Sequence, residues 1–326
     1  MSDDLEDTQP TKTESDALDG GEAENASDSL ENAPDEGETL KDFFSFEEIF
    51  RRILATADDE LEKNNTLLLW SGLAAGLSLG LTFLARVLFT TLSGNESPGL
   101  VGNLFYPVGF LLIVIGRYQL FTENTLTPVV LVLTKLASLR NLLRLWGVVF
   151  VGNMVGALVV TALLAFTGVL NPEAKEIALK IGEHANEFGW SVLFWRAVVA
   201  GWLVASMVWL VHGTRDTVSK IAIVWILMFF IGAGELFHVI TSSVEVFFVA
   251  FEGETAFLPL WSGFVLPVLL GNIAGGVVFV AVLNYMQFGE FREGEIFEHY
   301  GERLSWRDWL FSHKPDDERH STPKEI

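Results

Sequence analysis

The stretch that decides the fold is Gly116-Arg-Tyr-Gln-Leu-Phe-Thr-Glu-Asn-Thr125, read together with Gly232-Ala-Gly-Glu-Leu-Phe-His-Val-Ile-Thr241. At an offset of 116 positions, the Gly, Gln/Glu, Leu, Phe and Thr residues of the two stretches fall in register. A second pair follows in the same order at an offset of 119: Gly152-Asn-Met-Val-Gly156 and Gly271-Asn-Ile-Ala-Gly275. Short apolar matches are common, but two matches in the same order predict an internal repeat.

Each repeat lies in a set of long apolar segments. Uncharged segments long enough to span a bilayer cover residues 67–85, 145–172, 197–214 and 255–289. Two further segments, 104–134 and 221–251, are 31 residues long and contain charges. As straight helices they would measure about 46 Å, against roughly 30 Å of hydrocarbon. They must therefore tilt, re-enter or break, and Pro107 and Pro128 favour breaks in the first.

The arrangement of these segments predicts an inverted repeat. Three spans in each half is an odd number, so the second half must cross the membrane upside down relative to the first. Paired broken helices in inverted repeats place a solute path near the midplane of the membrane. We therefore expect an all-α membrane protein with six transmembrane helices, two inverted three-helix repeats, and broken second and fifth helices.

Charge gives the expected orientation. Eleven Lys/Arg residues lie in the segments before span one, between spans two and three, between four and five, and after span six, against two in the other loops. The positive-inside rule then places both termini in the cytoplasm and the chain in the cell membrane. Residues 1–40 hold 14 Asp/Glu and one Lys, so we expect a disordered acidic tail there. This acidity argues against a nucleic-acid partner.

The expected domain boundaries follow from this pattern. After the 1–40 tail comes an interfacial amphipathic helix in 41–65, a channel domain in 66–289 and a charged cytoplasmic tail in 290–326. Apolar residues in 42–63 recur at helical spacing. Such a helix lies either on the membrane surface or docked on the protein's own underside, and the sequence favours neither placement.

Enzyme chemistry finds no support in the sequence. The chain has no cysteine, which removes disulfides and cysteine-based metal or redox sites. It also lacks the HExxH, GxxxxGK[ST] and GxGxxG signatures, so we expect no enzyme, no metal and no cofactor. The partners expected instead are the lipid bilayer, a small-molecule solute and further copies of the chain.

The paired Gly-Asn-x-x-Gly motifs have a packing interpretation. Small residues four apart allow helices to approach closely, and an asparagine amide can bond across the contact. We therefore interpret these residues as helix-packing residues and not as solute contacts: Gly152, Asn153, Gly156, Gly271, Asn272 and Gly275.

The same motifs resemble the formate/nitrite transporter family. The stretches 152–157 and Leu266–Gly276 look like its third and sixth helices, Leu120–Thr122 like its second-helix break, and Gly234–His238 like its fifth-helix break. The resemblance covers roughly residues 42–289 and is closest to a longer-chain branch. It implies an aquaporin-like homopentamer with one pore per protomer that passes monovalent anions such as formate or nitrite.

The resemblance also implies which residues of this chain line the pore: apolar residues that form constrictions, and a polar pair between them. The polar pair would be Thr122 and His238, and the repeat alignment also sets these two opposite each other. The constriction positions would be Phe110, Leu120, Phe121, Val204 and Ile231.

Several positions depart from the family pattern. The family's Gly-Phe-Glu-His becomes Gly234-Glu-Leu-Phe-His238, so the acid stands three residues before the histidine. Ser242 replaces an asparagine, the family's vestibule lysine has no clear match, and Glu123 is an added acid beside Thr122. These differences bear on anion selectivity above all.

The residues leave alternatives open. A bare anion in an apolar constriction loses its hydration, and a midplane histidine could supply the proton that neutralises it. The plainer interpretation of His238 is a structural residue that holds the break together. Arg117, Glu123 and Glu235 form either internal ion pairs or a charged lining of the path. The function classes are thus an anion channel or proton-coupled transporter, a pore for neutral or cationic solutes, and a non-conducting sensor or scaffold.

Overall fold

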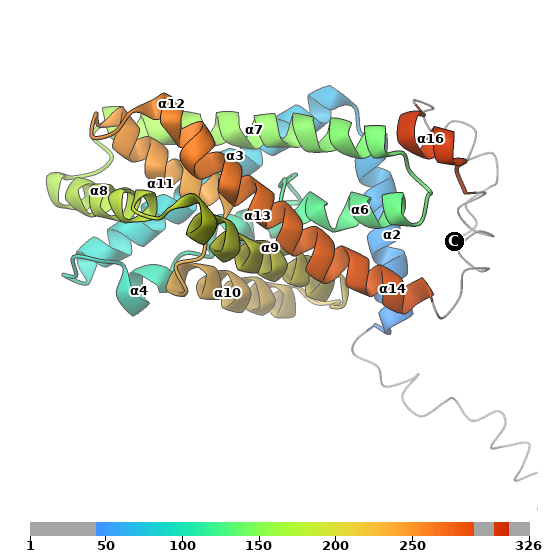
Figure 1. Ribbon diagram of the computed structural model, residues 1–326. Coiled ribbons are helices and arrows are strands. Elements are labelled where there is room, and N and C mark those ends of the chain that lie inside the picture. The colour runs from blue at the N-terminus through green and yellow to red at the C-terminus, as the bar shows by residue number, and fades with distance from the viewer. Residues whose placement is uncertain (1–43, 290–302, 313–326) are drawn as a thin grey trace, which may run out of the picture. The chain divides into compact units, whose positions relative to one another are not determined.

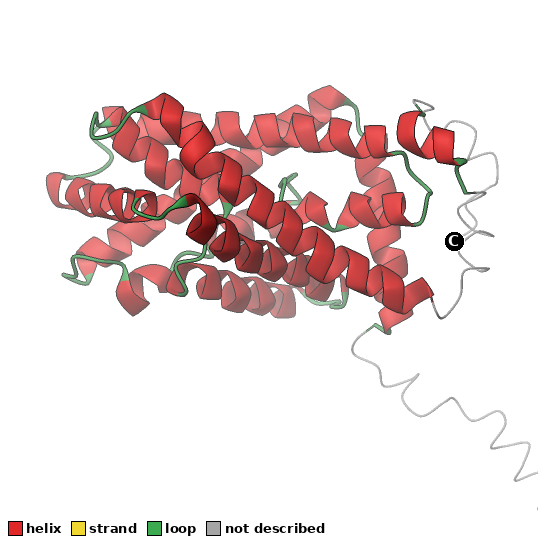
Figure 2. Cartoon of the chain, in the orientation of Figure 1, coloured by secondary structure: helices red, strands yellow, loops and turns green. Residues whose placement is uncertain are grey.

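The structure is a computed structural model that describes residues 44–289 and 303–312. The expected acidic tail of residues 1–40 lies outside the described residues. Within them, every regular element is a helix and no strand occurs (Figure 2). The described chain from Phe44 onward belongs to one compact unit.

The elements follow one another in this order: α2 (Phe46–Glu62), α3 (Asn65–Leu92), α4 (Gly99–Leu104), α5 (Val108–Gly116), η1 (Glu123–Thr125), α6 (Thr127–Leu133), α7 (Leu139–Phe166), α8 (Pro172–Asn186), α9 (Trp190–His212), α10 (Thr217–Ala233), α11 (Val239–Phe251), α12 (Phe257–Leu260), η2 (Trp261–Val265), α13 (Leu266–Gly276), η3 (Val277–Val282), α14 (Leu283–Gly289) and α16 (Trp306–Phe311).

Polar side chains fix where the long helices begin. Asn64 accepts a hydrogen bond from the backbone of Leu67 at 2.9 Å, and Ser138 accepts one from Asn141 at 3.2 Å. Each satisfies a backbone N–H that the first turn of a helix leaves without a partner. In the described residues, five helical stretches are long and apolar enough to cross a membrane: 65–92, 99–116, 139–166, 190–212 and 257–288.

The segment expected as the fifth span is divided. It forms α10 and α11, separated at Gly234–His238, so neither part reaches the length of a full crossing by itself. The segment expected as the second span is divided as well, into α4 and α5 on one side and η1 and α6 on the other. Both breaks fall inside the stretches that the repeat singled out.

The Gly-Asn-x-x-Gly motifs bring two pairs of helices into close contact, α3 with α7 and α9 with α13. A Cβ added at Gly156 would lie 2.4 Å from the carbonyl oxygen of Leu73, and one at Gly275 would lie 2.0 Å from that of Val198. No side chain fits at such distances. The backbones can therefore touch only because these positions are glycine.

Helix α2 is docked on the rest of the chain, the second of the two placements considered for this segment. Phe50, Ile53 and Leu54 are completely buried, and Phe50 stacks on Phe288 with ring centroids 4.0 Å apart. The helix packs mainly against α6 (Figure 1). Its start is held by Ser45 and Glu48, each bonding the backbone N–H of the other.

Part of the segment expected to be a C-terminal tail is likewise docked. Trp309 of α16 donates its indole N–H to the carbonyl oxygen of Val132 at 2.8 Å, and Leu304 bonds the carbonyl of Lys135 at 3.0 Å. The Lys135 ammonium lies 3.8 Å from the centre of the Trp306 ring. Residues 303–312 therefore cover the turn between α6 and α7.

Candidate functional site between the two helix breaks

The first break begins where α5 ends at Gly116. Arg117 adopts a left-handed conformation, with φ 55°, and closes the helix. The chain then runs non-helically to Thr122 before η1 and α6 begin. The second break begins after Ala233, where Glu235 is left-handed with φ 49°. His238 precedes α11 and caps it.

Each break is stabilised by its own asparagine from a neighbouring helix. Asn153 of α7 accepts a bond from the backbone N–H of Phe121 at 2.9 Å and donates to the carbonyls of Gln119 and Gly72. Asn272 of α13 does the same for the other break: it accepts from Val239 at 2.8 Å and donates to the carbonyls of Phe237 and Ala197. These side chains supply the partners that the broken helices lack.

These bonds correct the register of the repeat at the breaks. The two asparagines equate Gln119 with Phe237 and Phe121 with Val239, an offset of 118 and not 116. Leu120, and not Thr122, is therefore the equivalent of His238. Thr122 and His238 still meet, because the two breaks approach each other at this point.

The Thr122–His238 contact is the centre of the site. Thr122 Oγ1 lies 2.7 Å from His238 Nε2, and both residues are completely buried. The other ring nitrogen, Nδ1, accepts from the backbone N–H of Thr241 at 3.3 Å and lies 3.2 Å from the Thr241 hydroxyl. This assigns the ring proton to Nε2, which donates to Thr122.

Apolar side chains surround this pair. The ring of Phe110 meets the His238 ring edge to face, with centroids 5.0 Å apart. Leu120 and Phe121 precede Thr122 and are buried, and Phe121 packs against Trp146 and Phe150. Val204 on α9 and Ile231 on α10 are buried as well. The polar pair thus lies in surroundings that strongly disfavour a bare charge.

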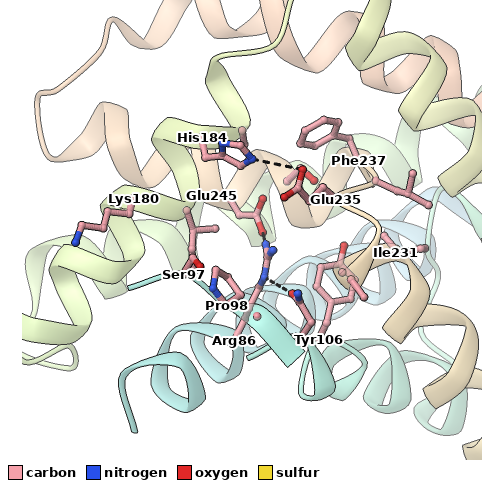
Figure 3. Close-up of a pocket in the computed structure, with 18 of the residues that line it drawn as sticks. Arg86, Ser97, Pro98, Tyr106, Lys180, His184, Ile231, Glu235, Phe237 and Glu245 are labelled. Atoms are coloured by element: carbon pink, nitrogen blue, oxygen red, sulfur yellow. Dashed lines mark hydrogen bonds and ion pairs between the residues drawn. The ribbon is translucent and has the colours of Figure 1, made fainter. Parts of the chain in front are cut away.

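A cavity of about 550 Å³ lies between Arg86, His184 and Phe237 (Figure 3). Ile231 and Ser242 line it, together with residues from the turns before α4 and α11. Tyr106 lines it too, and its ring centroid lies 5.8 Å from that of Phe110. A row of three rings, Tyr106, Phe110 and His238, therefore leads from the cavity to the polar pair.

Charged side chains in the cavity wall are paired with each other. Arg86 of α3 bonds Glu245 of α11 at 2.8 Å and Asn103 at 2.9 Å. Glu235 meets Arg196 at 3.1 Å and His184 Nε2 at 3.5 Å. In Figure 3, Glu245 lies beside Arg86 and Glu235 lies beside His184, so the two glutamates belong to different ion pairs in the cavity wall. Most of the fixed charge in the cavity is thus compensated by its neighbours.

The expected pairing of Arg117 with Glu123 or Glu235 is not found in the described part of the chain. Arg117 is exposed at the end of α5, whereas Glu235 is paired with Arg196 and His184. Arg86 is half-buried and forms an ion pair with the buried Glu245. The opposite signs of these ionisable groups indicated pairing, but partners that lie 39 to 159 positions apart could not be matched from the sequence.

Two solved structures share the fold of this chain. Solved structures described as an FNT family ion channel and as a pentameric formate channel with formate bound have the same fold. Their TM-scores are 0.63 and 0.60, with 22% and 21% identity, and they cover 73% and 69% of this chain and 98% and 97% of their own. The chain therefore shares the all-helical fold of these two structures.

The formate/nitrite transporter family model matches residues 47–286. The inner membrane protein YfdC of Escherichia coli strain K12 is 35% identical over 242 residues, 73% of this chain and 77% of its own. A probable formate transporter of Methanothermobacter thermautotrophicus is 34% identical over 208 residues, 58% of this chain and 75% of its own. The chain belongs to the formate/nitrite transporter family.

Proposed function

We propose that this protein is a channel for small monovalent anions of weak acids, such as formate or nitrite. The observation that carries the proposal is the buried Thr122–His238 hydrogen bond, set among apolar rings where two helix breaks meet. Relatives named as formate channels and as a nitrite transporter support the class of solute.

The proposed mechanism neutralises the anion before it crosses the apolar constriction. A charged His238 ring passes its Nε2 proton to the Thr122 oxygen, and the Thr122 hydroxyl proton goes to the anion. The products are a neutral acid and a neutral ring, and the reverse transfer restores the anion on the other side. The transfer leaves the proton of the neutral ring on Nδ1, where the Thr241 hydroxyl can accept from it. In the resting ring, whose proton is on Nε2, the same hydroxyl can donate to Nδ1.

The proposed assembly is an aquaporin-like homopentamer with one pore per protomer and both termini in the cytoplasm. Six crossings in two inverted halves explain why matched asparagines serve both breaks. We propose the channel domain as residues 66–289, with Phe110, Leu120, Phe121, Val204 and Ile231 as its constrictions and Ser242 on its outer approach. One structural neighbour is described as pentameric, which supports the oligomeric state.

A pore for neutral or cationic solutes is the second candidate. Three glutamates line the cavity described above, together with the cationic Arg86 and Lys180. The glutamates are Glu96, Glu235 and Glu245. This acid content gives an entering anion no clear electrostatic attraction.

Flux measurements decide between the two candidates. Purified protein in liposomes is tested with formate, nitrite, acetate, urea, glycerol and potassium, against empty liposomes. Formate or nitrite flux that rises as the pH falls supports the anion channel. Urea, glycerol or potassium flux without anion flux overturns it.

A further inference from the structure

Two acidic side chains approach each other on the α2 side of the first break. Glu60 of α2 is only 7% exposed, and Glu123 directly follows Thr122 in the chain. The side chains of Gln119 and Asn124 link Glu60 to the residue next to Glu123, and the two carboxyl groups repel each other electrostatically. The ion pairs recorded for residues 44–289 and 303–312 involve neither of them.

Hydrogen bonds to Glu60 favour its negatively charged form but do not outweigh the effect of its burial. Thr127 donates its hydroxyl to one carboxyl oxygen of Glu60 at 2.5 Å, and Gln119 donates its amide to the other at 3.4 Å. The shorter distance is that of a hydroxyl bound to an ionised acceptor. Asn124 in turn donates to Gln119 at 3.2 Å, which ties its amide to the same network.

The neighbouring acceptors have no such support. Glu123 Oε1 and Asn124 Oδ1 are buried, and no described group donates a hydrogen bond to either; Asn124 is completely buried. A buried acceptor without a donor is costly, and a second negative charge beside Glu60 would add to the cost. A single proton removes one of the two charges and turns a carboxyl group into a donor.

We propose that Glu60 and Glu123 together hold one exchangeable proton and form a proton-binding site on the α2 side of Leu120 and Phe121. This site is distinct from the Thr122–His238 pair, because α2 contributes half of it. The proposal goes beyond the proposed function and does not depend on it, since protonation can be observed without transport.

None of the charged groups described near α2 forms an ion pair with Glu60 or Glu123. Lys63 acts on Glu60 through space and makes no recorded ion pair with it. Arg144 of α7 uses its guanidinium on the backbone carbonyls of Leu61 and Lys63 and on Asn65. His212 of α9 bonds Thr56, one turn before Glu60. Helix α6, against which α2 packs, has no titratable residue.

The pair should make folding stability depend on pH. Burial raises the pKa of Glu60 above its ordinary value, and the bonds from Thr127 and Gln119 together with Lys63 offset this only in part. The folded protein therefore holds a proton that the unfolded chain has released once the pH exceeds the ordinary glutamate pKa. Stability should fall as pH rises from there to the raised value and then level off.

Infrared difference spectroscopy of the full-length protein in lipid nanodiscs tests the proposal. Spectra at pH 7 are compared between the wild type and the double variant Glu60→Gln/Glu123→Gln. We expect the wild type to show one extra protonated-carboxyl band, sensitive to deuterium exchange, and one extra carboxylate band. The control is Asp59→Asn, an exposed acid on the same helix, which should lose a carboxylate band only.

Two results would overturn the site. One is a difference spectrum with two carboxylate bands and no protonated carboxyl. The other is a protonated band that appears only when sodium is replaced by choline, because a metal cation would then be the occupant. If the double variant does not fold, the two single variants are compared in its place, and each must change the protonated band.

Discussion

His238 is the residue on which the proposed mechanism depends. It is completely buried, its ring nitrogens are bonded to Thr122 and Thr241, and it faces Phe110. As the residue before α11 it also accepts a backbone bond from the first turn, so it has a structural part as well. An asparagine can take over that capping bond but cannot carry a proton between two states.

The variant His238→Asn should therefore fold and assemble while losing proton-dependent flux. General acid–base assistance typically contributes about a hundredfold or more to a rate, and we expect a loss of that order with a flattened pH profile. The measurement is formate flux into liposomes between pH 5 and 8, with size-exclusion chromatography to check assembly. A folded variant that keeps the wild-type rate and pH profile would show that the proton-exchange mechanism is wrong.

Thr122→Val removes only the hydroxyl that joins the ring to the solute path. We expect flux to fall roughly tenfold, less than in His238→Asn, because the ring remains but loses its orienting bond. The matched control is Thr161→Val: that hydroxyl is equally buried but bonds only the carbonyl of Ala157 in its own helix. Equal effects of the two variants on flux would mean that the loss comes from packing and not from the polar pair.

At the scale of elements, each break depends on an asparagine from a neighbouring helix. Asn272→Leu leaves the backbone groups of Phe237 and Val239 buried without partners, which costs about 1–3 kcal/mol for each group. We expect a clear drop in the thermal midpoint of the detergent-solubilised protein.

The control for that prediction is Asn284→Leu. Asn284 lies further along the same run of helix and bonds only the carbonyl of Val280, so its loss should lower the midpoint far less. If the two variants have the same thermal midpoint, the hydrogen bonds of Asn272 do not stabilise the second break.

The elements could be predicted from sequence to the extent that their signals are local. Hydropathy located the long helices, and the repeat located both breaks, because these signals lie within a few residues of each other. The pair Thr122 and His238 was predicted from the family resemblance, and the repeat alignment agreed with it although its register is two residues from the structural one. Glu60 could not be found, since an acid in an amphipathic helix is typical of the solvent-facing side.

Ion pairs between residues far apart in the sequence could not be predicted either. Arg86 and Glu245 lie 159 positions apart, and His184 approaches Glu235 from a helix between the two repeats. Charge alone indicates that such groups need partners in a membrane, but it does not say which. The choice depends on how helices pack. The local pattern marked Gly156 as a packing residue but did not show that it contacts Leu73.

For the whole molecule, the orientation in the membrane can be tested directly. The chain has no cysteine, so single cysteines report their own accessibility. We expect cysteines at Asn95 and Glu254 to react with an impermeant maleimide added outside intact cells, and a cysteine at Arg140 to react only after lysis; all three positions are exposed. Labelling of position 95 only after lysis would mean that the molecule is oriented the other way.

The bonds of Asn153 and Asn272 also restrict how such a pore can open and close. Each break is bonded to a helix that is itself locked, backbone against backbone, to a third helix through glycines. Moving a break relative to this framework would therefore break the two hydrogen bonds that its asparagine makes to it. Any gate must therefore consist of side chains such as Phe110, Leu120 or Phe121 that rotate within a fixed backbone. Such rotations occur on the fast timescale of side-chain motion, and not on the slower timescale of helix movement.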